Sequence, residues 1–410
     1  MVLDEKILLS QIGELGKIGF DPADPSAGRT RLALSDADKQ GRDLLVKWMR
    51  ELDLDVRVDR IGNIFGILHS SQNDDLSKSL MIGSHIDTVI HAGPLDGCFG
   101  VLSGLAVIRS FRSVGKNPER PIVVAAFTNE EGVRFHPDMV GSLVHAGGYS
   151  LEDALSAVGT DGERFGDELK RIGYAGDLEV GAIVPREYLE LHIEQGPFLE
   201  SENAVIGVVE SVQGISWQRV TMKGTANHAG ATPMRLRHDA GYVAAETIVR
   251  LREIALDSEA TRATVGTLRF EPNAINVVPG KAVFTIDLRD PDETNLCAAE
   301  GKLSEFLKDI TVREGIEIST ERMVRFTPVR FDGKLVDLIE TVVGRSGLRY
   351  RRMPSGAGHD AQMMARICPS AMIFVPSREG ISHNPAEHTD DAHLATGARI
   401  LLSVVLECMK

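Results

Sequence analysis

Histidine and carboxylate side chains recur where apolar segments of the sequence end. His85 and Asp87 lie in the segment GSHIDTV, and Asp96 lies in the turn GPLDG that follows it. His192 lies in the alternating segment LELHIEQG, and His383 follows another apolar run. Imidazole nitrogen combined with carboxylate oxygen is the donor set of hydrolytic zinc and manganese sites. These residue types therefore predict metal-assisted hydrolysis.

Two adjacent glutamates, Glu130 and Glu131, follow the apolar segment of residues 121–128. Like-charged carboxylates at a buried strand end repel each other and are costly to desolvate unless a cation neutralises them. Lysine is missing from their immediate neighbours, and the nearest arginine is Arg134. A metal ion is therefore the expected partner. Because adjacent side chains point in different directions, one glutamate can bind metal while the other holds the attacking water.

Each of these motifs has a plainer structural explanation when it is taken alone. Asp96 could be an ordinary helix N-cap, a role worth about 1 kcal/mol, and His383 could be a structural loop histidine. Glu130 and Glu131 could form a solvated acidic turn. Together, however, three histidines and three carboxylates match a site for two ions about 3.5–4 Å apart. Five ligands, one of them a bridging carboxylate, would leave one acidic residue free for proton transfer.

The elements expected to position these residues alternate between helix and strand. Apolar periodicity predicts a helix over residues 36–52, capped by Ser35. Further elements are expected as a strand pair at 55–68, strands at 79–86 and 121–128, and helices at 97–111 and 390–409. This alternation implies an α/β sheet with helices on its faces. In such sheets ligand sites gather at the carboxyl ends of strands, which is where the histidines lie.

A second pattern occupies residues 213–328, which separate two parts of the first domain at 1–212 and 329–410. Its order is βαββαβ, the arrangement of a ferredoxin-like α+β domain. The expected strands are 215–222, 263–270, 282–288 and 315–320, and the expected helices are 240–254 and 294–310. The simplest arrangement is a small domain inserted into a larger, discontinuous one.

Composition excludes several classes of function. The chain has 410 residues and a formal net charge of −14, which argues against nucleic acid as a partner. No apolar run approaches the roughly 18 residues of a membrane span, and the N-terminal residues lack the order of a signal peptide. The four cysteines are far apart and form no CxxC pair. We therefore expect reduced thiols and a cytoplasmic protein.

The motifs taken together resemble those of the M20-type metallo-amidohydrolase family. They are GSHIDTV, GPLDGCFG, FTNEEG, LHIEQGP, NHAGATPM, NVVPGK, LRD, PSGAGHD and GISHNPAEH. The resemblance covers nearly the whole chain. It is strongest to the hydantoinase/carbamoylase branch, which contains N-carbamoyl-L-amino acid hydrolases, allantoate amidohydrolases and β-ureidopropionases. It implies a metallopeptidase-like catalytic domain with a mixed sheet, and a dimerisation or lid role for the inserted domain.

The resemblance also implies a metal site with two divalent ions per subunit. Zinc or manganese is expected, with cobalt or nickel as alternatives. The family pattern assigns the metal ligands to His85, Asp96, Glu131, His192 and His383. It makes Asp96 the bridging ligand, and it pairs His85 with Glu131 on one ion and His192 with His383 on the other. Glu130 matches the general base, and Asp87 is expected to act beside it by orienting His85.

The implied reaction is attack of metal-activated water on an amide-like carbonyl, with Glu130 carrying the proton to the leaving nitrogen. His228 matches the donor that stabilises the oxyanion. Substrate-binding positions are matched by Gln195, Asn276, Arg289, Gly358 and His359, and the planar fork of Arg289 suits a carboxylate. The family pattern further implies a homodimer in which His228, Asn276 and Arg289 act across the interface.

The expected substrate is a small carboxylate bearing an N-carbamoyl (ureido) group, cleaved to ammonia and carbon dioxide. N-carbamoyl-L-amino acids and allantoate both remain open, because only the glycine before His359 bears on the choice. Two alternatives are an M20-type peptidase or N-acyl amino acid deacylase, and a catalytically inactive scaffold. The first would prefer a dipeptide over ureido acids. The second would be expected to lack a metal ligand or the base, and all are present in the sequence.

Overall fold

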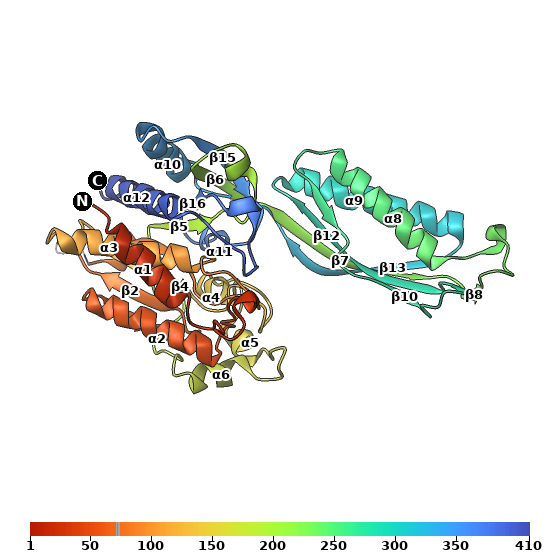
Figure 1. Cartoon of the computed structure of the whole chain (residues 1–410), viewed down its shortest axis with the longest axis horizontal. Helices are drawn as coiled ribbons and strands as arrows, with labels where there is room; N and C mark the ends of the chain where they lie inside the picture. The colour runs from red at the N-terminus through yellow and green to blue at the C-terminus, as the bar shows by residue number, and fades with distance from the viewer. Residues whose placement is uncertain (71, 73) are drawn as a thin grey trace. The chain divides into compact units, whose positions relative to one another are not determined.

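The computed structural model describes residues 1–70, 72 and 74–410. These residues form two compact units, and each is described by itself. The first unit comprises Met1–Glu210 and Phe331–Lys410, and the second comprises Ser211–Arg330 (Figure 1). The predicted boundaries after residues 212 and 328 lie two residues from the observed ones.

A mixed sheet forms the centre of the first unit, with strands in the order β1-β2-β4-β3-β5-β16-β6 and β15 paired with β6. The four strands β4, β3, β5 and β16 are parallel neighbours, whereas β1, β2 and β6 run antiparallel to theirs. The strand bounds are β1 (Asp55–Val58), β2 (Ile64–Leu68), β3 (Leu80–His85), β4 (Ile122–Phe127), β5 (Glu187–Ile193), β6 (Ile206–Val212), β15 (Tyr350–Ser355) and β16 (Ser370–Val375).

Helices cover the sheet of the first unit. Helices α1, α3 and α12 pack against one another, and α4 packs against α11. The bounds are α1 (Glu5–Leu15), α2 (Asp36–Glu51), α3 (Cys98–Ser113), α4 (Val140–His145), α5 (Leu151–Ser156), α6 (Phe165–Arg171), α7 (Phe198–Ser201), α10 (Gly333–Arg345), α11 (Asp360–Met364) and α12 (Asp391–Cys408). Short 3₁₀ helices occupy η1 (Pro25–Ala27), η2 (Leu76–Lys78) and η4 (Arg378–Gly380). Within the described residues, no helix is both long and apolar enough to cross a membrane.

The sequence-based elements of the first unit agree with the structure to within a few residues. Ser35 caps α2 by accepting a hydrogen bond from the backbone N–H of Asp38, as its position before the apolar periodicity predicted. Every residue of β3, β4 and β16 is buried. Continuous apolar runs mark such strands because parallel strands are covered on both faces.

The second unit is an antiparallel sheet with α8 and α9 along one face (Figure 1). Its strand order, β10-β12-β7-β13 with β9 beside β12, is that of a ferredoxin-like domain. The bounds are β7 (Gly214–Lys223), β8 (Asn227–His228), η3 (Met234–Leu236), α8 (Ala240–Leu256), β9 (Arg262–Thr264), β10 (Leu268–Glu271), β11 (Val277–Val278), β12 (Lys281–Asp290), α9 (Glu293–Glu314), β13 (Glu317–Phe326) and β14 (Val329–Arg330).

The second unit differs from the prediction in three details. The last strand, expected at 315–320, is β13 (Glu317–Phe326), which extends six residues further. The single strand expected at 263–270 is divided into β9 and β10, because the register shifts between Thr264, opposite Asp287, and Leu268, opposite Phe284. Four residue steps from Thr264 to Leu268 lie opposite three residue steps of β12, and such an extra residue in one strand is a β-bulge. The two-stranded sheet of β8 and β11 was not predicted, since two-residue strands leave no periodic signal.

Candidate metal centre

The parallel strands of the first unit bring four predicted site segments to one edge of the sheet. His85 is the last residue of β3, and His192 lies near the end of the neighbouring β5. Glu130 follows β4 on the other side of β3, and His383 follows β16 on the other side of β5. Because parallel strands end at the same edge, residues far apart in the chain converge here.

The two strand histidines are oriented by backbone carbonyl groups. His85 Nδ1 lies 3.0 Å from the carbonyl oxygen of Asp87, and His192 Nδ1 lies 2.9 Å from that of Ile193. A carbonyl oxygen can only accept a hydrogen bond, so each Nδ1 carries the proton. Each Nε2 is then unprotonated, the usual arrangement for liganding histidines, and that of His192 accepts a hydrogen bond from the backbone N–H of Gly97 at 3.1 Å.

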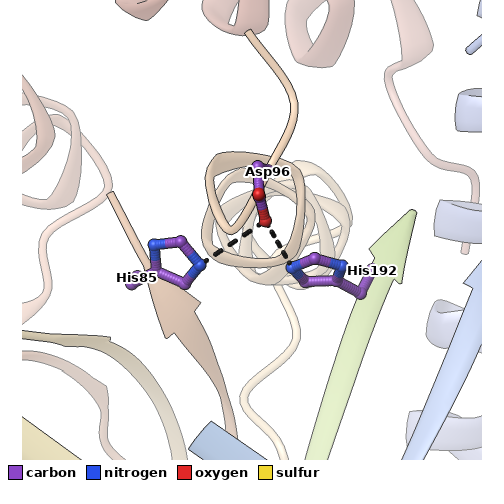
Figure 2. A group of neighbouring side chains, drawn as sticks. All are labelled: His85, Asp96 and His192. Carbon is purple, nitrogen blue, oxygen red and sulfur yellow. Dashed lines mark ion pairs between the residues drawn. The ribbon is translucent and has the colours of Figure 1, made fainter. Parts of the chain in front are cut away.

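Asp96 lies between these histidines, as Figure 2 shows. Its Oδ1 is 3.2 Å from His192 Nε2 and 3.7 Å from His85 Nε2, and all three side chains are buried. Gly97, which follows, has a φ of 63°. A Cβ there would also lie 2.4 Å from the His85 ring. Glycine at this position lets the turn carry Asp96 up to the histidines.

A second ligand group uses the other oxygen of Asp96. Asp96 Oδ2 is 3.0 Å from His383 Nε2, and Glu131 Oε2 is 3.3 Å from the same nitrogen. The ligand atoms of His85, Asp96 and His192 lie within 4.8 Å of one another, and so do those of Asp96, Glu131 and His383. The structure thus groups His85 with His192, not with Glu131 as the family pattern predicted. The two oxygens of Asp96 account for this grouping, because Oδ1 faces His85 and His192 whereas Oδ2 faces His383.

The site holds more buried negative charge than its cationic side chains balance. Burial and the charge of Asp96 raise the pKa of Glu131 to about 8, and burial also raises the pKa of Glu130 well above its usual value. Hydrogen bonding with Asp96 raises the pKa of His383 to about 9. Burial acts to raise the pKa of Asp96 itself, but hydrogen bonds with the histidines outweigh burial and hold it well below its usual value.

This donor set fits divalent metal ions. Carboxylates and imidazoles bind metal in their deprotonated forms, so a cation would replace the protons that the crowded carboxylates otherwise hold. Three Nε2 atoms face the carboxylates, and cysteine is not among the donors. Such nitrogen and oxygen donors suit zinc, manganese, cobalt or nickel.

Asp87 contacts the glutamate pair in addition to the His85 segment. Its Oδ1 accepts a hydrogen bond from the backbone N–H of Glu130 and its Oδ2 one from that of Glu131, each at 3.3 Å. Its carboxylate is 3.9 Å from His85 Nδ1, whereas its carbonyl oxygen is at hydrogen-bond distance. The backbone of Asp87 therefore orients His85, and the side chain anchors the glutamates.

The predicted substrate-binding residues of the first unit lie around this centre. Gln195 Nε2 donates to Asp96 Oδ2 at 2.8 Å, while its Oε1 is buried without a partner among the described residues. The His359 ring is 4.5 Å from that of His192, and His359 Nε2 lies 2.9 Å from Ser355 Oγ. A Cβ on Gly358 would contact only flexible side-chain ends, beginning 3.2 Å from Met139 Cε.

The second unit carries the remaining predicted residues, and it brings two of them together. His228 in β8 pairs with Val277 of β11, directly after Asn276. His228 Nδ1 accepts hydrogen bonds from the backbone N–H groups of Gly230 and Ala231, each at 3.1 Å. A neutral imidazole has one donor and one acceptor nitrogen, so Nε2 carries the proton and is the donor.

Arg289 lies at the opposite end of the second unit's sheet from Asn276. It occupies the end of β12 that pairs with Ile215, and it contacts the Asp287 carboxylate at 2.9–3.0 Å. The other end of β12 begins at Lys281, three residues after β11 ends. Eight residues of extended strand span about 27 Å. The structure therefore does not bring Arg289 and Asn276 together, although both were predicted to bind the substrate.

The sequence pattern of peptidase family M20/M25/M40 matches residues 81–407. This match covers most of the chain. The chain belongs to this family.

Similar proteins place it more closely within the family. An N-carbamoyl-L-amino-acid amidohydrolase of Rhizobium meliloti is 41% identical over 401 residues, which cover 98% of this chain and 95% of that protein. The allantoate amidohydrolase of Escherichia coli (strain K12) is 36% identical over 387 residues, which cover 92% of each. A crystal structure of an amidase of the hydantoinase/carbamoylase family from Burkholderia multivorans matches with a TM-score of 0.94 at 41% identity, covering 99% of this chain and 98% of that chain. The predicted family and the α/β fold with its mixed sheet are confirmed.

In this M20 family protein, a layer of buried polar residues beneath the histidines escaped the sequence analysis. Glu190 is near enough to His192 and His359 to suggest a third ligand group. Its carboxylate already accepts hydrogen bonds from Ser84 Oγ, the Tyr188 hydroxyl and the backbone N–H of Ala361 at 2.7–3.0 Å. With three donors bound, Glu190 is a support for the site and not a metal ligand. Alternating polarity in β5 was its only sequence signal.

Proposed function

We propose that this protein hydrolyses the C–N bond of an N-carbamoyl group on a small carboxylate substrate, releasing ammonia and carbon dioxide. The substrate is an N-carbamoyl-L-amino acid or allantoate. The observation that carries the proposal is the double ligand group around Asp96, found in a chain whose relatives are named for both activities.

The proposed site holds two divalent metal ions, zinc or manganese. His85 and His192 would hold one ion, His383 and Glu131 would hold the other, and Asp96 belongs to both ligand groups. Bound metal lowers the pKa of water and polarises the substrate carbonyl. These are the two effects that a urea-like carbonyl, which is a poor electrophile, requires.

Glu130 is the proposed proton carrier. Its Oε2 lies 3.4 Å from His85 Nε2, and the side chain is buried. Glu130 is not needed as a ligand, because the two ligand groups already contain five residues, which are Asp96 and four others. In the proposed reaction it takes the proton of the attacking water and delivers it to the leaving nitrogen.

Polar atoms of the predicted substrate-binding and catalytic residues match the groups of a ureido substrate. The buried Oε1 of Gln195 can accept a hydrogen bond from the carbamoyl –NH₂, which an N-acyl group lacks. The Nε2–H of His228 can donate to the oxyanion that develops on the carbonyl oxygen. Arg289 is the proposed partner of the substrate carboxylate, with Asn276 assisting at the other end of the substrate.

The separation of Arg289 and Asn276 in the second unit supports the proposal of a homodimer. A small substrate cannot span the roughly 27 Å of β12 that separates their ends of the sheet, so we propose that the two residues contact one substrate from two copies of the chain. We propose that His228 and Asn276 act across the interface and that Arg289 acts in its own chain. This modifies the prediction that all three act in trans. An apolar stripe on α8, formed by the exposed Tyr242, Val249 and Leu256, supports an interface on this unit.

The test is turnover of N-carbamoyl-L-alanine, allantoate, N-acetyl-L-alanine and a dipeptide, each under zinc, manganese and cobalt. Ammonia release measures turnover of the two ureido acids, and release of free amino acid measures turnover of the acetyl compound and the dipeptide. We expect turnover of one or both ureido acids and little of the others. Preference for the dipeptide or the acetyl compound would identify a peptidase or deacylase. Absence of turnover with fewer than two ions per chain would identify an inactive scaffold.

The unpaired cysteines support a reducing, cytoplasmic location.

A further inference from the structure

Glu387 is a buried carboxylate for which the proposed reaction has no use. Its side chain is 4% exposed. One oxygen accepts hydrogen bonds from the backbone N–H groups of Leu95 at 2.8 Å and Asp96 at 3.3 Å. The other accepts one from Ser382 Oγ at 2.9 Å. Glu387 therefore connects the turn that carries Asp96 with the loop that carries His383.

These contacts close into a ring around the second ligand group. Ser382 Oγ also accepts a hydrogen bond from Gln195 Nε2 at 3.1 Å, and the same nitrogen donates to Asp96 Oδ2 at 2.8 Å. The path runs from Asp96 through Glu387, Ser382 and Gln195 back to Asp96. His383 lies in the segment between Ser382 and Glu387, so the ring holds both ends of that segment.

His383 depends on this support more than the other ligands do. It is 51% exposed, whereas the side chains of His85, Asp96, Glu131 and His192 are at most 5% exposed. Its φ of 52° is unfavourable for a residue with a Cβ. Neither a strand nor close packing fixes it, so its distance from Asp96 is set by its loop.

Glu387 packs closely against the turn that carries Asp96. A side chain of a different length at position 387 could not make the same contacts. A Cβ added at Gly93 would lie 2.2 Å from Glu387 Cβ. The side chain of Glu387 thus begins against the turn and reaches along it to the N–H groups of Leu95 and Asp96. Aspartate is one methylene shorter and cannot span the same path, while glutamine can.

We propose that Glu387 is a positioning residue that sets the separation of Asp96 and His383, and with it the affinity for the second metal ion. This inference rests on the proposed two-metal function. It assigns Glu387 no contact with substrate or metal. Residues that orient metal ligands in this way change metal affinity by about 10–100-fold when they are lost.

The test is a zinc titration of the chelator-treated full chain against a chromophoric chelator, which gives the number of ions and each Kd. We expect two ions for the wild type. Glu387→Ala and Glu387→Asp should retain the first ion and bind the second about 10–100-fold more weakly. Glu387→Gln keeps the length and both backbone acceptor contacts, so it should bind both ions nearly as the wild type does. Ser382→Ala, which removes one arm of the ring, should weaken the second ion by a smaller factor.

Asp59 provides a matched control for general destabilisation. It is a buried carboxylate of the same unit that accepts hydrogen bonds from the backbone of Ile61 and Asn63 and from the Asn63 side chain. Asp59→Ala should lower the Tm and leave both zinc affinities unchanged.

Three results would overturn the role of Glu387. In the first, Glu387→Ala binds both zinc ions with the wild-type Kd. In the second, it binds both ions more weakly by the same factor. In the third, Glu387→Asp keeps the wild-type affinity for the second ion and Glu387→Gln does not. If the wild type itself binds fewer than two ions, the two-metal proposal fails instead.

Discussion

Asp87 Oδ1 accepts a hydrogen bond from the backbone N–H of Glu130 at 3.3 Å. Asp87 lies two residues beyond the end of β3, and Glu130 lies three residues beyond the end of β4. The contact ties the two loops together where they leave neighbouring strands. It holds the backbone that directs the Glu130 carboxylate toward His85. The Asp87 carboxylate itself lies 3.9 Å from His85 Nδ1, beyond hydrogen-bond distance.

Replacing Asp87 with asparagine should therefore impair turnover more than metal binding. Asparagine keeps one acceptor oxygen, but its –NH₂ group would face the backbone N–H of Glu130 or Glu131. We expect kcat for the preferred ureido substrate to fall about 10–100-fold with little change in KM and two zinc ions still bound. Steady-state kinetics and zinc titration on the same preparation measure both effects. Loss of the ion at His85 with an unchanged kcat per bound metal would instead assign Asp87 to orienting that histidine.

Glu130→Gln should retain both metal ions and lose nearly all activity. Glutamine has the size of glutamate but cannot accept the proton of the attacking water. General acid–base catalysis contributes about 10²–10⁴-fold, and kcat should fall by a factor in this range. Metal content by atomic absorption, measured beside ammonia release, separates catalysis from binding.

Glu131→Ala should give the opposite pattern. Glu131 Oε2 lies 3.3 Å from His383 Nε2 in the second ligand group. Its removal should lower the zinc content from two ions toward one per chain, because that group would keep only Asp96 and His383 as ligands. If Glu130→Gln and Glu131→Ala both retain full activity, neither residue has its proposed role.

The extent to which the sequence predicted this site follows from the kinds of contact involved. Apolar runs located the parallel strands, and their common carboxyl edge accounts for the meeting of His85, His192 and Glu130. Glu387 was missed because it binds backbone N–H groups 291 and 292 residues away, and backbone groups leave no mark in the sequence. The ligand grouping required the positions of the two Asp96 oxygens, and the separation of Arg289 from Asn276 required the register of β12.

Asp360 provides a pH-dependent test of the buried layer beneath the histidines. Ser142 Oγ donates to its Oδ1 at 2.5 Å, while its Oδ2 is buried without a partner among the described residues. Burial and the charge of Glu190 raise the pKa of Asp360 to about 8. The folded chain therefore holds a proton that the unfolded chain releases near pH 4. Between these values the unfolded state binds fewer protons, so stability is lost as the pH rises toward 8.

Asp360→Asn should remove this pH-dependent cost while keeping the acceptor for Ser142. The Tm of the variant minus that of the wild type, measured with chelator present, should grow from about pH 5 to pH 8 and stay constant above. A gain on the order of 1–3 kcal/mol corresponds to roughly 2–6 °C. A difference in Tm that does not change with pH would show that Asp360 carries no such proton.

Subunit mixing tests the proposed division of roles between two chains. Dimers that contain one His228→Ala chain and one Glu130→Gln chain can be purified by two different affinity tags. If His228 acts across the interface, one site in each mixed dimer receives an intact Glu130 from the first chain and an intact His228 from the second. Such dimers should show about half the wild-type activity, although both parent homodimers are nearly inactive.

The companion mixture replaces His228→Ala with Arg289→Ala. Arg289 is proposed to act in its own chain. The site with an intact Glu130 then lacks Arg289, and the site with an intact Arg289 lacks Glu130. This mixed dimer should stay nearly inactive. Recovery in both mixtures would place Arg289 in trans with His228, which the roughly 27 Å length of β12 between their ends of the sheet argues against. Recovery in neither would mean that every site is built within one chain, and the reason for a dimer would then have to lie outside catalysis.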